Sequence, residues 1–182
     1  MFLTRRMLLA VGVFGMAGST NAGLPAFRVI YRGSLFADYF QIYLRDEGHP
    51  DLPDDYSDVA IARRLVSGLH AVILHTVRNM TVPVVVEWHN ARPAPHLDAY
   101  QHVAEAGFFC PSGKLVLAGL TDHDPSAPRL VVKAGPLGVR VNMSGLDTLR
   151  ENGLEADDHY LLQIWSGMES EDVRVLKAWS GR

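Results

Sequence analysis

Histidine and aspartate recur along this 182-residue chain, and both side chains can bind metal ions or transfer protons. The densest clusters are Asp122-His123-Asp124 and Asp157-Asp158-His159. Consecutive side chains in a tight loop rarely converge on one ion, so both clusters are predicted to be solvated turns. No two histidines have the His-x-x-x-His spacing that brings ligands together on a helix. We therefore expect no metal site among the histidines, which stand at positions 49, 70, 75, 89, 96, 102, 123 and 159.

Candidate nucleophiles are equally sparse. Gly113-Lys114 resembles the end of a phosphate-binding loop, but Phe108 stands where that motif needs its first glycine, and Leu115 replaces Ser or Thr. The Gly-x-Ser-x-Gly motif of a nucleophile elbow is absent from the sequence. The single cysteine, Cys110, precedes a proline at a predicted strand end and is expected to be a small buried hydrophobic residue. We predict no catalytic residue and no cofactor.

Acidic residues crowd the segment between positions 46 and 58, where Pro50 and Pro53 restrict the backbone. Only Arg45 and His49 offset this charge locally. The segment is either a hydrated loop that keeps the protein soluble or a negatively charged surface complementary to a basic partner. In the second interpretation the partner-binding residues are Asp46, Glu47, Asp51, Asp54, Asp55 and Asp58.

The composition restricts the function classes further. Lys and Arg number 17 against 20 Asp and Glu, which gives a formal charge of −3 and argues against a nucleic-acid-binding protein. Apolar residues make up 48% of the chain and charged residues 20%, so the chain can bury a core and whole-chain disorder is excluded. One cysteine cannot form an intrachain disulfide framework.

From Phe27 onward apolar residues recur with a period of two, in short runs separated by Gly, Pro, Asn and Asp, which is typical of β-strands. Residues 69–77 and 82–88 are predicted to pair as a hairpin through Asn79-Met80, and a second hairpin is predicted around 135–138. Because one open sheet would leave a hydrophobic face bare, we predict an all-β protein, a single antiparallel β-sandwich of about ten strands. The strands are predicted within 27–32, 35–44, 69–77, 82–88, 100–110, 114–118, 129–133, 139–143, 160–165 and 173–179.

One short helix is predicted to interrupt the strands, over residues 58–66. Ser57 can cap its N-terminus, and the carboxylate of Asp58 in the first turn is favoured by the helix dipole. Gly68 follows the last apolar position and is expected to stop the helix.

The first 22 residues have the three regions of a signal peptide. Arg5 and Arg6 are followed by an uncharged run from Met7 to Gly18 and by small residues that end at Ala22. The paired arginines resemble a twin-arginine export signal. About twelve residues of helix reach roughly 18 Å, which is too short to span a hydrocarbon core of about 30 Å. We expect residues 1–22 to be removed, residues 23–182 to form one domain, and the protein to be periplasmic or extracellular. The alternative is a cytoplasmic protein with an N-terminal extension.

Several segments, distributed over most of the chain after Phe27, form a set of landmarks that pack rather than react. They are Tyr56-Ser57-Asp58-Val59-Ala60-Ile61, Ser67-Gly68-Leu69 before a strand with Thr76, Val82-Pro83-Val84-Val85-Val86-Glu87, Pro111-Ser112-Gly113-Lys114-Leu115, Gly138-Val139-Arg140-Val141, and Asp158-His159-Tyr160-Leu161-Leu162-Gln163-Ile164-Trp165. Together these segments resemble the competence protein J family, whose founding activity is inhibition of a DNA-entry nuclease. The resemblance implies a non-enzymatic binding protein.

Three function classes follow from these observations. The favoured one is a protein-binding inhibitor or immunity-like module that acts on a nuclease or another enzyme or toxin with a basic cleft. The second is an exported ligand-binding sandwich, for example for glycans, and the third is a hydrolase built from Asp and His pairs that only the fold could assemble. The second class needs aromatic rings exposed along one groove, and the candidates are Tyr39, Tyr43, Trp88, Tyr100, Trp165 and Trp179.

Overall fold

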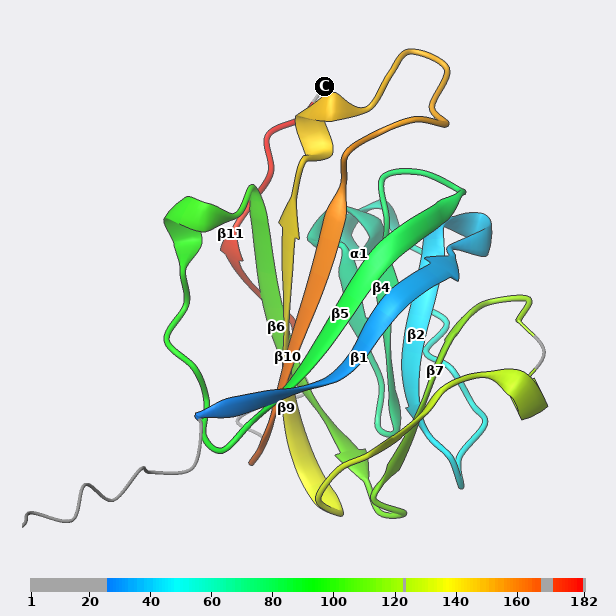
Figure 1. Ribbon diagram of the computed structural model, residues 1–182, viewed down its shortest axis with the longest axis vertical. Helices are drawn as coiled ribbons and strands as arrows, with labels where there is room; N and C mark the ends of the chain where they lie inside the picture. Colours follow the sequence, from blue (N-terminus) through cyan, green and yellow to red (C-terminus); the bar gives the residue numbers. More distant parts are fainter. Residues whose placement is uncertain (1–25, 123, 168–171, 182) are drawn as a thin grey trace, which may run out of the picture.

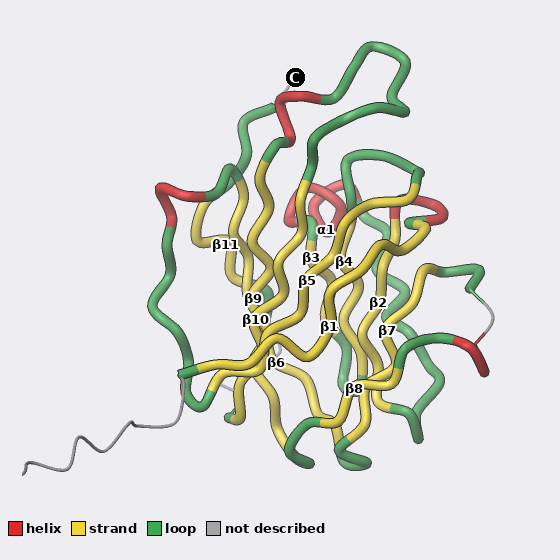
Figure 2. The backbone as a smooth tube through the Cα atoms, viewed as in Figure 1, coloured by secondary structure: helices red, strands yellow, loops and turns green. Residues whose placement is uncertain are grey.

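The structure, a computed structural model, describes residues 26–122, 124–167 and 172–181. Two β-sheets pack face to face, and the short helical segments lie outside them (Figures 1 and 2). The helix is α1 (Asp58–Arg63), and four 3-10 turns cover Asp38–Phe40, Leu97–Ala99, Asp124–Ser126 and Leu146–Thr148. The strands of this part of the chain are β1 (Phe27–Phe36), β2 (Gln41–Asp46), β3 (Leu65–Ser67), β4 (Ala71–His75), β5 (Thr81–His89), β6 (His102–Cys110), β7 (Lys114–Gly119), β8 (Arg129–Val131), β9 (Gly135–Ser144), β10 (His159–Ser166) and β11 (Arg174–Lys177).

The strand order confirms the predicted sandwich and corrects the prediction that all of its neighbouring strands are antiparallel. One sheet has the order β1-β5-β10-β9-β6-β11, and the other has the order β3-β4-β2-β7-β8. All neighbouring strands are antiparallel except β5 and β10, which are parallel, so the six-stranded sheet is mixed. The two strands are far apart in sequence and both begin at the same end of the sheet, where Tyr160 lies beside Val84.

The core lies between the sheets and follows the period-two pattern. In β5 the alternate residues Val82, Val84 and Val86 are fully buried, and in β10 Tyr160 and Ile164 face the same core. Trp165 has the opposite parity and is also buried, with its ring packed over Gly138 of the neighbouring strand β9. The strand order places β10 between β5 and β9, so the predictions that β10 is central and that Trp165 is buried are confirmed.

The predicted hairpins are wrong, because the chain crosses between the sheets at these turns. β4 belongs to the five-stranded sheet, whereas β5, beyond Asn79-Met80, belongs to the six-stranded sheet. The turn between β8 and β9 likewise joins different sheets. Tight turns of both kinds use Gly, Asn and Pro, so the sequence pattern does not distinguish a hairpin from a connection between sheets.

The predicted strand over 35–44 is also divided between the sheets. β1 ends at Phe36, a 3-10 turn follows, and β2 begins at Gln41 in the opposite sheet. Tyr39 and Phe40 have positive φ angles of 52° and 63°, which end the extended backbone. Apolar residues continue through the break because the turn itself carries aromatic side chains.

Helix α1 begins as predicted and ends early. The Ser57 hydroxyl accepts a hydrogen bond from the Ala60 N–H at 3.2 Å, which confirms the cap. The helix stops where Arg64 takes a left-handed conformation (φ 54°), and the following residues form β3 instead of reaching Gly68. Ala60 of the helix and Leu52 of the preceding loop pack on the outer face of the five-stranded sheet, over residues such as Tyr43.

Candidate functional site

The acidic segment leaves β2 at Asp46 and runs along the outside of the five-stranded sheet to α1 (Figure 1). Leu52 anchors it to that sheet. Glu47 is half-buried. The structure buries Asp46 completely and exposes four other predicted residues, namely Asp51, Asp54, Asp55 and Asp58.

Asp46 is a structural residue, which corrects its assignment to the partner surface. Its Oδ2 accepts hydrogen bonds from the Ser112 N–H (2.9 Å), the Ser112 hydroxyl (2.5 Å) and the Cys110 thiol (3.1 Å). Its Oδ1 accepts from the Gly48 N–H and lies 2.9 Å from His49 Nδ1. Burial by itself raises the pKa of this carboxyl, but the hydrogen bonds from Ser112, His49 and Cys110 outweigh burial and hold the pKa far below its usual value. The carboxylate ties the start of the acidic loop to the turn between β6 and β7.

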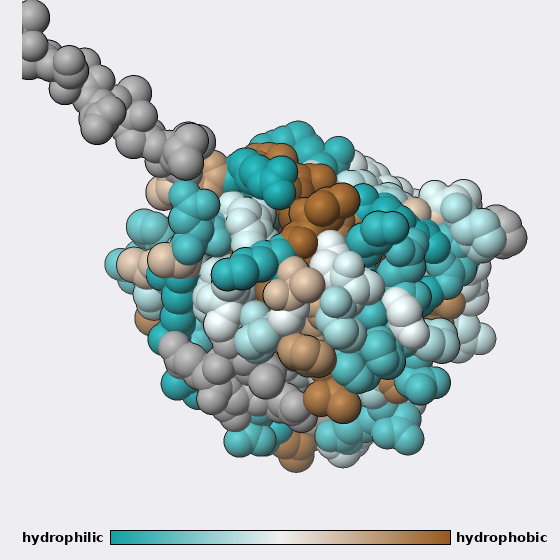
Figure 3. Space-filling view, turned by 90° about the horizontal axis from the view of Figure 1, so that it is seen from below, coloured by the Kyte–Doolittle hydropathy of each residue, from teal (hydrophilic) through white to brown (hydrophobic). Residues whose placement is uncertain are grey.

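Glu47 lies in a region where opposite charges are balanced. Its carboxylate is 3.2 Å from Arg129 Nε and 3.5 Å from Lys114 Nζ. Asp124 pairs with the same Arg129 and with Arg45. Seen from below, this end of the sandwich is mostly hydrophilic around a smaller hydrophobic area (Figure 3). Glu47 therefore adds little net negative charge to the surface.

The remaining four carboxylates form what we call the acidic surface, which consists of Asp51, Asp54, Asp55 and Asp58. Within the described part of the chain, none of the four makes a salt bridge. Asp55 Oδ1 accepts a hydrogen bond from the Ser57 N–H at 3.0 Å. That bond, together with the nearby charge of Arg63, lowers the pKa of Asp55. All four side chains face solvent.

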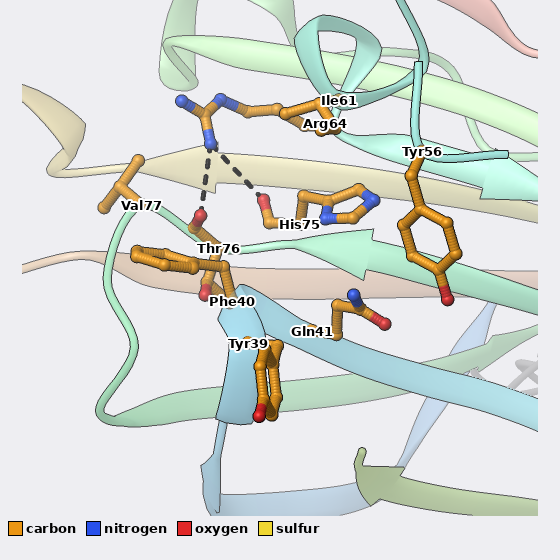
Figure 4. A pocket seen from close by; sticks show the side chains of 9 residues that line it. All are labelled: Tyr39, Phe40, Gln41, Tyr56, Ile61, Arg64, His75, Thr76 and Val77. Atoms are coloured by element: carbon orange, nitrogen blue, oxygen red, sulfur yellow. Dashed lines mark hydrogen bonds between the residues drawn. The ribbon is translucent and has the colours of Figure 1, made fainter. Parts of the chain in front are cut away.

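A pocket of about 300 Å³ adjoins this surface at the start of α1, and we call it the aromatic pocket. It is formed where three parts of the chain meet, namely the turn before β2, the end of β4, and α1 with its flanking residues (Figure 4). Tyr56 links it to the acidic surface, because this residue stands between Asp55 and Asp58 in the chain. The lining residues are Tyr39, Phe40, Gln41, Tyr56, Ile61, Arg64, His75, Thr76 and Val77.

Large aromatic side chains are unusually exposed around the pocket. Tyr39 is 65% exposed, Tyr56 is 53% exposed and Phe40 is 46% exposed. Exposed aromatic groups beside a hollow are typical of protein and ligand binding sites, where such rings provide large contact areas.

The backbone of the pocket is strained as well. Tyr39, Phe40 and Arg64 are the non-glycine residues with positive φ in the described part of the chain, and all three line the pocket. Hydrogen bonds hold these conformations in place, since the Thr76 N–H donates to the Phe40 carbonyl (2.9 Å) and the His75 N–H donates to the Arg64 carbonyl (3.1 Å). Left-handed residues cost about 1–3 kcal/mol each and gather at functional sites.

Two polar atoms of the pocket residues, Gln41 Oε1 and His75 Nε2, are buried and have no hydrogen-bond partner in the described part of the chain. Burial, followed by the charge of Arg64, lowers the pKa of His75, so its imidazole is neutral at pH 7. The Arg64 guanidinium donates to the His75 and Thr76 carbonyls (3.5 and 3.3 Å) and lies 4.9 Å from the centre of the Trp179 ring. Burial lowers the pKa of Arg64.

The polar face of the six-stranded sheet is a weaker candidate, because its groups already pair with one another. Glu87 Oε2 lies 2.9 Å from His89 Nε2 and accepts from Gln163 Nε2 at 3.3 Å. Gln163 Oε1 in turn accepts from Asn142 Nδ2 at 3.3 Å. This row of side chains crosses three adjacent strands and stabilises the sheet.

The other chemical candidates have structural roles. His123 lies outside the described residues, and the described His, Cys, Asp and Glu side chains form no cluster of three or more that could hold a metal ion. Asp158 is buried, 2.7 Å from Arg78 Nε, and accepts from the Tyr160 hydroxyl at 2.7 Å. Cys110 is buried as expected, and burial together with Asp46 raises the pKa of its thiol to about 12.

The six aromatic residues considered for glycan stacking are dispersed. Tyr43 and Trp165 are buried, and Trp88 is half-buried. Tyr39, Tyr100 and Trp179 each line a different pocket. This arrangement does not favour a glycan-binding groove.

Sequence reasoning finds the acidic surface and misses the aromatic pocket. Tyr39 and Phe40 fit the alternation of a continuous strand, and nothing in that pattern signals a turn. Gln41 and His75 are 34 positions apart and meet only because β2 and β4 pair. The predicted helix over 58–66 places Arg64 inside it, where a left-handed conformation is not expected.

No family model matches the sequence, and no match was found among curated proteins. Two solved structures match the fold. One is ComJ from Bacillus subtilis, described as the inhibitor of the DNA-degrading activity of NucA, with a TM-score of 0.59 and 12% identity. The chain has a ComJ-like fold. The match covers 78% of this chain and 98% of ComJ.

The second match is the product of crocagin biosynthetic gene J, with a TM-score of 0.50, 18% identity, and coverage of 77% of this chain and 97% of that one. Both comparisons span nearly the whole of the other protein, so the ComJ-like fold accounts for most of this chain. At these identities the likeness concerns the fold.

Proposed function

We propose that this protein is a non-enzymatic binding module that inhibits a nuclease, or another enzyme or toxin with a basic cleft. The observation that carries this proposal is the acidic surface, with three exposed carboxylates on one loop, a fourth at the first residue of α1, and no salt bridge among the described residues to neutralise them. The ComJ-like fold supports it, because ComJ inhibits the DNA-degrading activity of NucA.

The physical basis is competition for a positively charged site. A cleft that binds DNA presents Lys and Arg side chains to phosphates, and a rigid row of carboxylates can occupy the same positions. Opposite charges also speed the encounter, an effect that weakens as the Debye length falls from about 30 Å at 0.01 M salt to about 8 Å at 0.15 M. Pro50, Pro53 and the packing of Leu52 hold the loop in shape before binding.

The test is an association-rate measurement with a partner captured from the native host and identified by mass spectrometry. The triple variant Asp51→Asn, Asp54→Asn, Asp55→Asn removes three charges and keeps, at position 55, an amide oxygen able to accept from the Ser57 N–H. In stopped flow at about 0.01 M salt, we expect association to slow about tenfold, with the difference shrinking at 0.15 M.

The matched control removes the same charge from another part of the surface. Asp98, Glu151 and Asp157 are exposed and lie outside the acidic loop. Their replacement by Asn, Gln and Asn should leave the association rate within about twofold of wild type, because charges remote from an interface steer weakly. Equal rates for wild type and the acidic-surface variant at low salt would refute a docking role for this loop.

We also propose that the protein acts after export, on the basis of the signal-like residues 1–22, which lie outside the described part of the chain. In the described part, no helix has the length and hydrophobicity needed to cross a lipid bilayer.

A further inference from the structure

The aromatic pocket contains unmet hydrogen-bonding capacity, which points to the chemistry of its occupant. Gln41 is 6% exposed and His75 is 5% exposed, and they face each other across the β2–β4 pair. Among the residues that the structure describes, neither Gln41 Oε1 nor His75 Nε2 has a hydrogen-bond partner. Buried polar groups in native proteins are nearly always paired, so an unpaired couple beside a pocket indicates a ligand group that completes it.

A cationic occupant does not fit the pocket. Arg64 lines the pocket, and its guanidinium is bound to two carbonyl groups and lies over the Trp179 ring, with no salt bridge to a carboxylate among the described residues. A second cation in the same pocket would be repelled by this charge. Lysine and arginine side chains are therefore disfavoured.

An anionic or purely apolar occupant fits no better. Gln41 Oε1 is an acceptor, so a carboxylate would place two acceptors face to face, and Asp55 and Asp58 flank Tyr56 at the entrance. An apolar group would fill the space and leave both buried atoms unpaired. The remaining class is a neutral group that both donates and accepts.

We propose that the aromatic pocket receives the carboxamide of an asparagine or glutamine side chain from the protein partner. Its NH2 group donates to Gln41 Oε1, and its carbonyl oxygen accepts from His75 Nε2 in the neutral tautomer that carries the proton there. The Tyr56 ring lies on the same side as the His75 ring and the Gln41 amide, where it can pack against the planar amide, and Tyr39 and Phe40 line the same pocket (Figure 4). This inference rests on the proposed protein-binding function: the acidic surface attracts a basic partner, and the neutral side chain anchors it.

The pocket chemistry can be tested without the partner. Butyramide, butyrate and butylguanidinium share an unbranched four-carbon chain, which in the first two includes the carbonyl carbon, and they differ in the polar group. Each compound is titrated to about 50 mM into ¹⁵N-labelled protein. Binding is monitored in NMR spectra through the side-chain nitrogen signals of His75 and Gln41. We expect butyramide to saturate with a Kd in the millimolar range, and the two ions to bind at least about tenfold more weakly.

Variants locate the binding. Gln41→Met removes the acceptor at similar length and should abolish butyramide binding. Tyr39→Gly removes an exposed ring, and glycine freely adopts the positive φ angle of this position. This second variant therefore tests the pocket even if Gln41→Met fails to fold. The matched control is Asn79→Ala, because Asn79 Oδ1 is also buried and unpaired but the residue does not line the pocket. This control should bind butyramide like wild type.

Two results would overturn the inference: no saturable shift with butyramide up to about 50 mM, or tighter binding of butylguanidinium or butyrate. Neither result would affect the conclusion of the salt-dependent association experiment, because that experiment reports on the acidic surface. Conversely, wild type and the acidic-surface variant could associate at equal rates while butyramide binds normally. That result would refute the docking role of the acidic surface and support the carboxamide site.

Discussion

Replacing Asp46 with alanine tests whether this buried carboxylate organises the base of the acidic loop. It accepts hydrogen bonds from the backbone N–H groups of Gly48 and Ser112, the Ser112 hydroxyl and the Cys110 thiol. Asp46→Ala removes the acceptor of the two N–H groups and leaves the Ser112 hydroxyl and the Cys110 thiol only the Lys114 carbonyl. The turn between β6 and β7 then loses its link to the end of β2.

The expected loss is about 2–4 kcal/mol of unfolding free energy. A buried donor without an acceptor costs about 1–3 kcal/mol, but Gly48 and Ser112 lie at the surface, where water can replace part of the interaction. For a domain of this size, each kcal/mol shifts the melting temperature by about 2–4 °C. The melting temperature should therefore fall by about 4–16 °C in calorimetry or circular dichroism.

A pH series separates the charge from the packing. Folding lowers the pKa of Asp46, so its ionised form contributes stability above the unfolded carboxyl pKa of about 3.9, and this contribution is lost as pH falls toward the folded pKa. The stability difference between wild type and Asp46→Asn should be constant above about pH 5 and shrink below about pH 4.

The control is Asp51→Ala, at an exposed position of the same loop, which should change stability by no more than about 0.5 kcal/mol. The reasoning fails if Asp46→Ala costs less than about 1 kcal/mol. It also fails if the difference from Asp46→Asn persists unchanged at about pH 2.5.

Trp165→Ala should cost about 3–5 kcal/mol in a urea melt, because the ring is buried and fills the space that a Cβ at Gly138 would occupy. A shift of less than about 2 °C in melting temperature would contradict this packing. Cys110 should resist a thiol reagent at about pH 8 in the folded protein and react fully in guanidinium, because burial and Asp46 raise the pKa of its thiol to about 12. Rapid labelling of the native protein would count against the Asp46 contact. Intact-mass analysis of secreted protein should show a chain that begins at Gly23, whereas a soluble cytoplasmic form that retains residues 1–22 would argue for an intracellular protein.

The sequence by itself determined the local structure. Alternation along β5 and β10 predicted strands whose inner residues, such as Val84 and Ile164, are buried together. Ser57 and Asp58 predicted the start of α1, because capping depends on residues only three positions apart. The exposed acidic residues from Asp51 to Asp58 were also evident, since closely spaced carboxylates without basic neighbours are rarely buried together.

The tertiary structure alone decided how these elements pair and what they bring together. The turns around Asn79 and Gly135 could close hairpins or cross between sheets, and only the need to bury both sheet faces selects crossing. Asp46 looks like one more acidic surface residue until the turn at Ser112, 66 positions later, supplies donors that a buried carboxylate requires. The aromatic pocket combines the turn at Tyr39, the end of β4 at His75 and the left-handed Arg64. Its shape depends on long-range strand pairing, and no local pattern encodes such pairing because a period of two fixes the face of a side chain and not the identity of its neighbour.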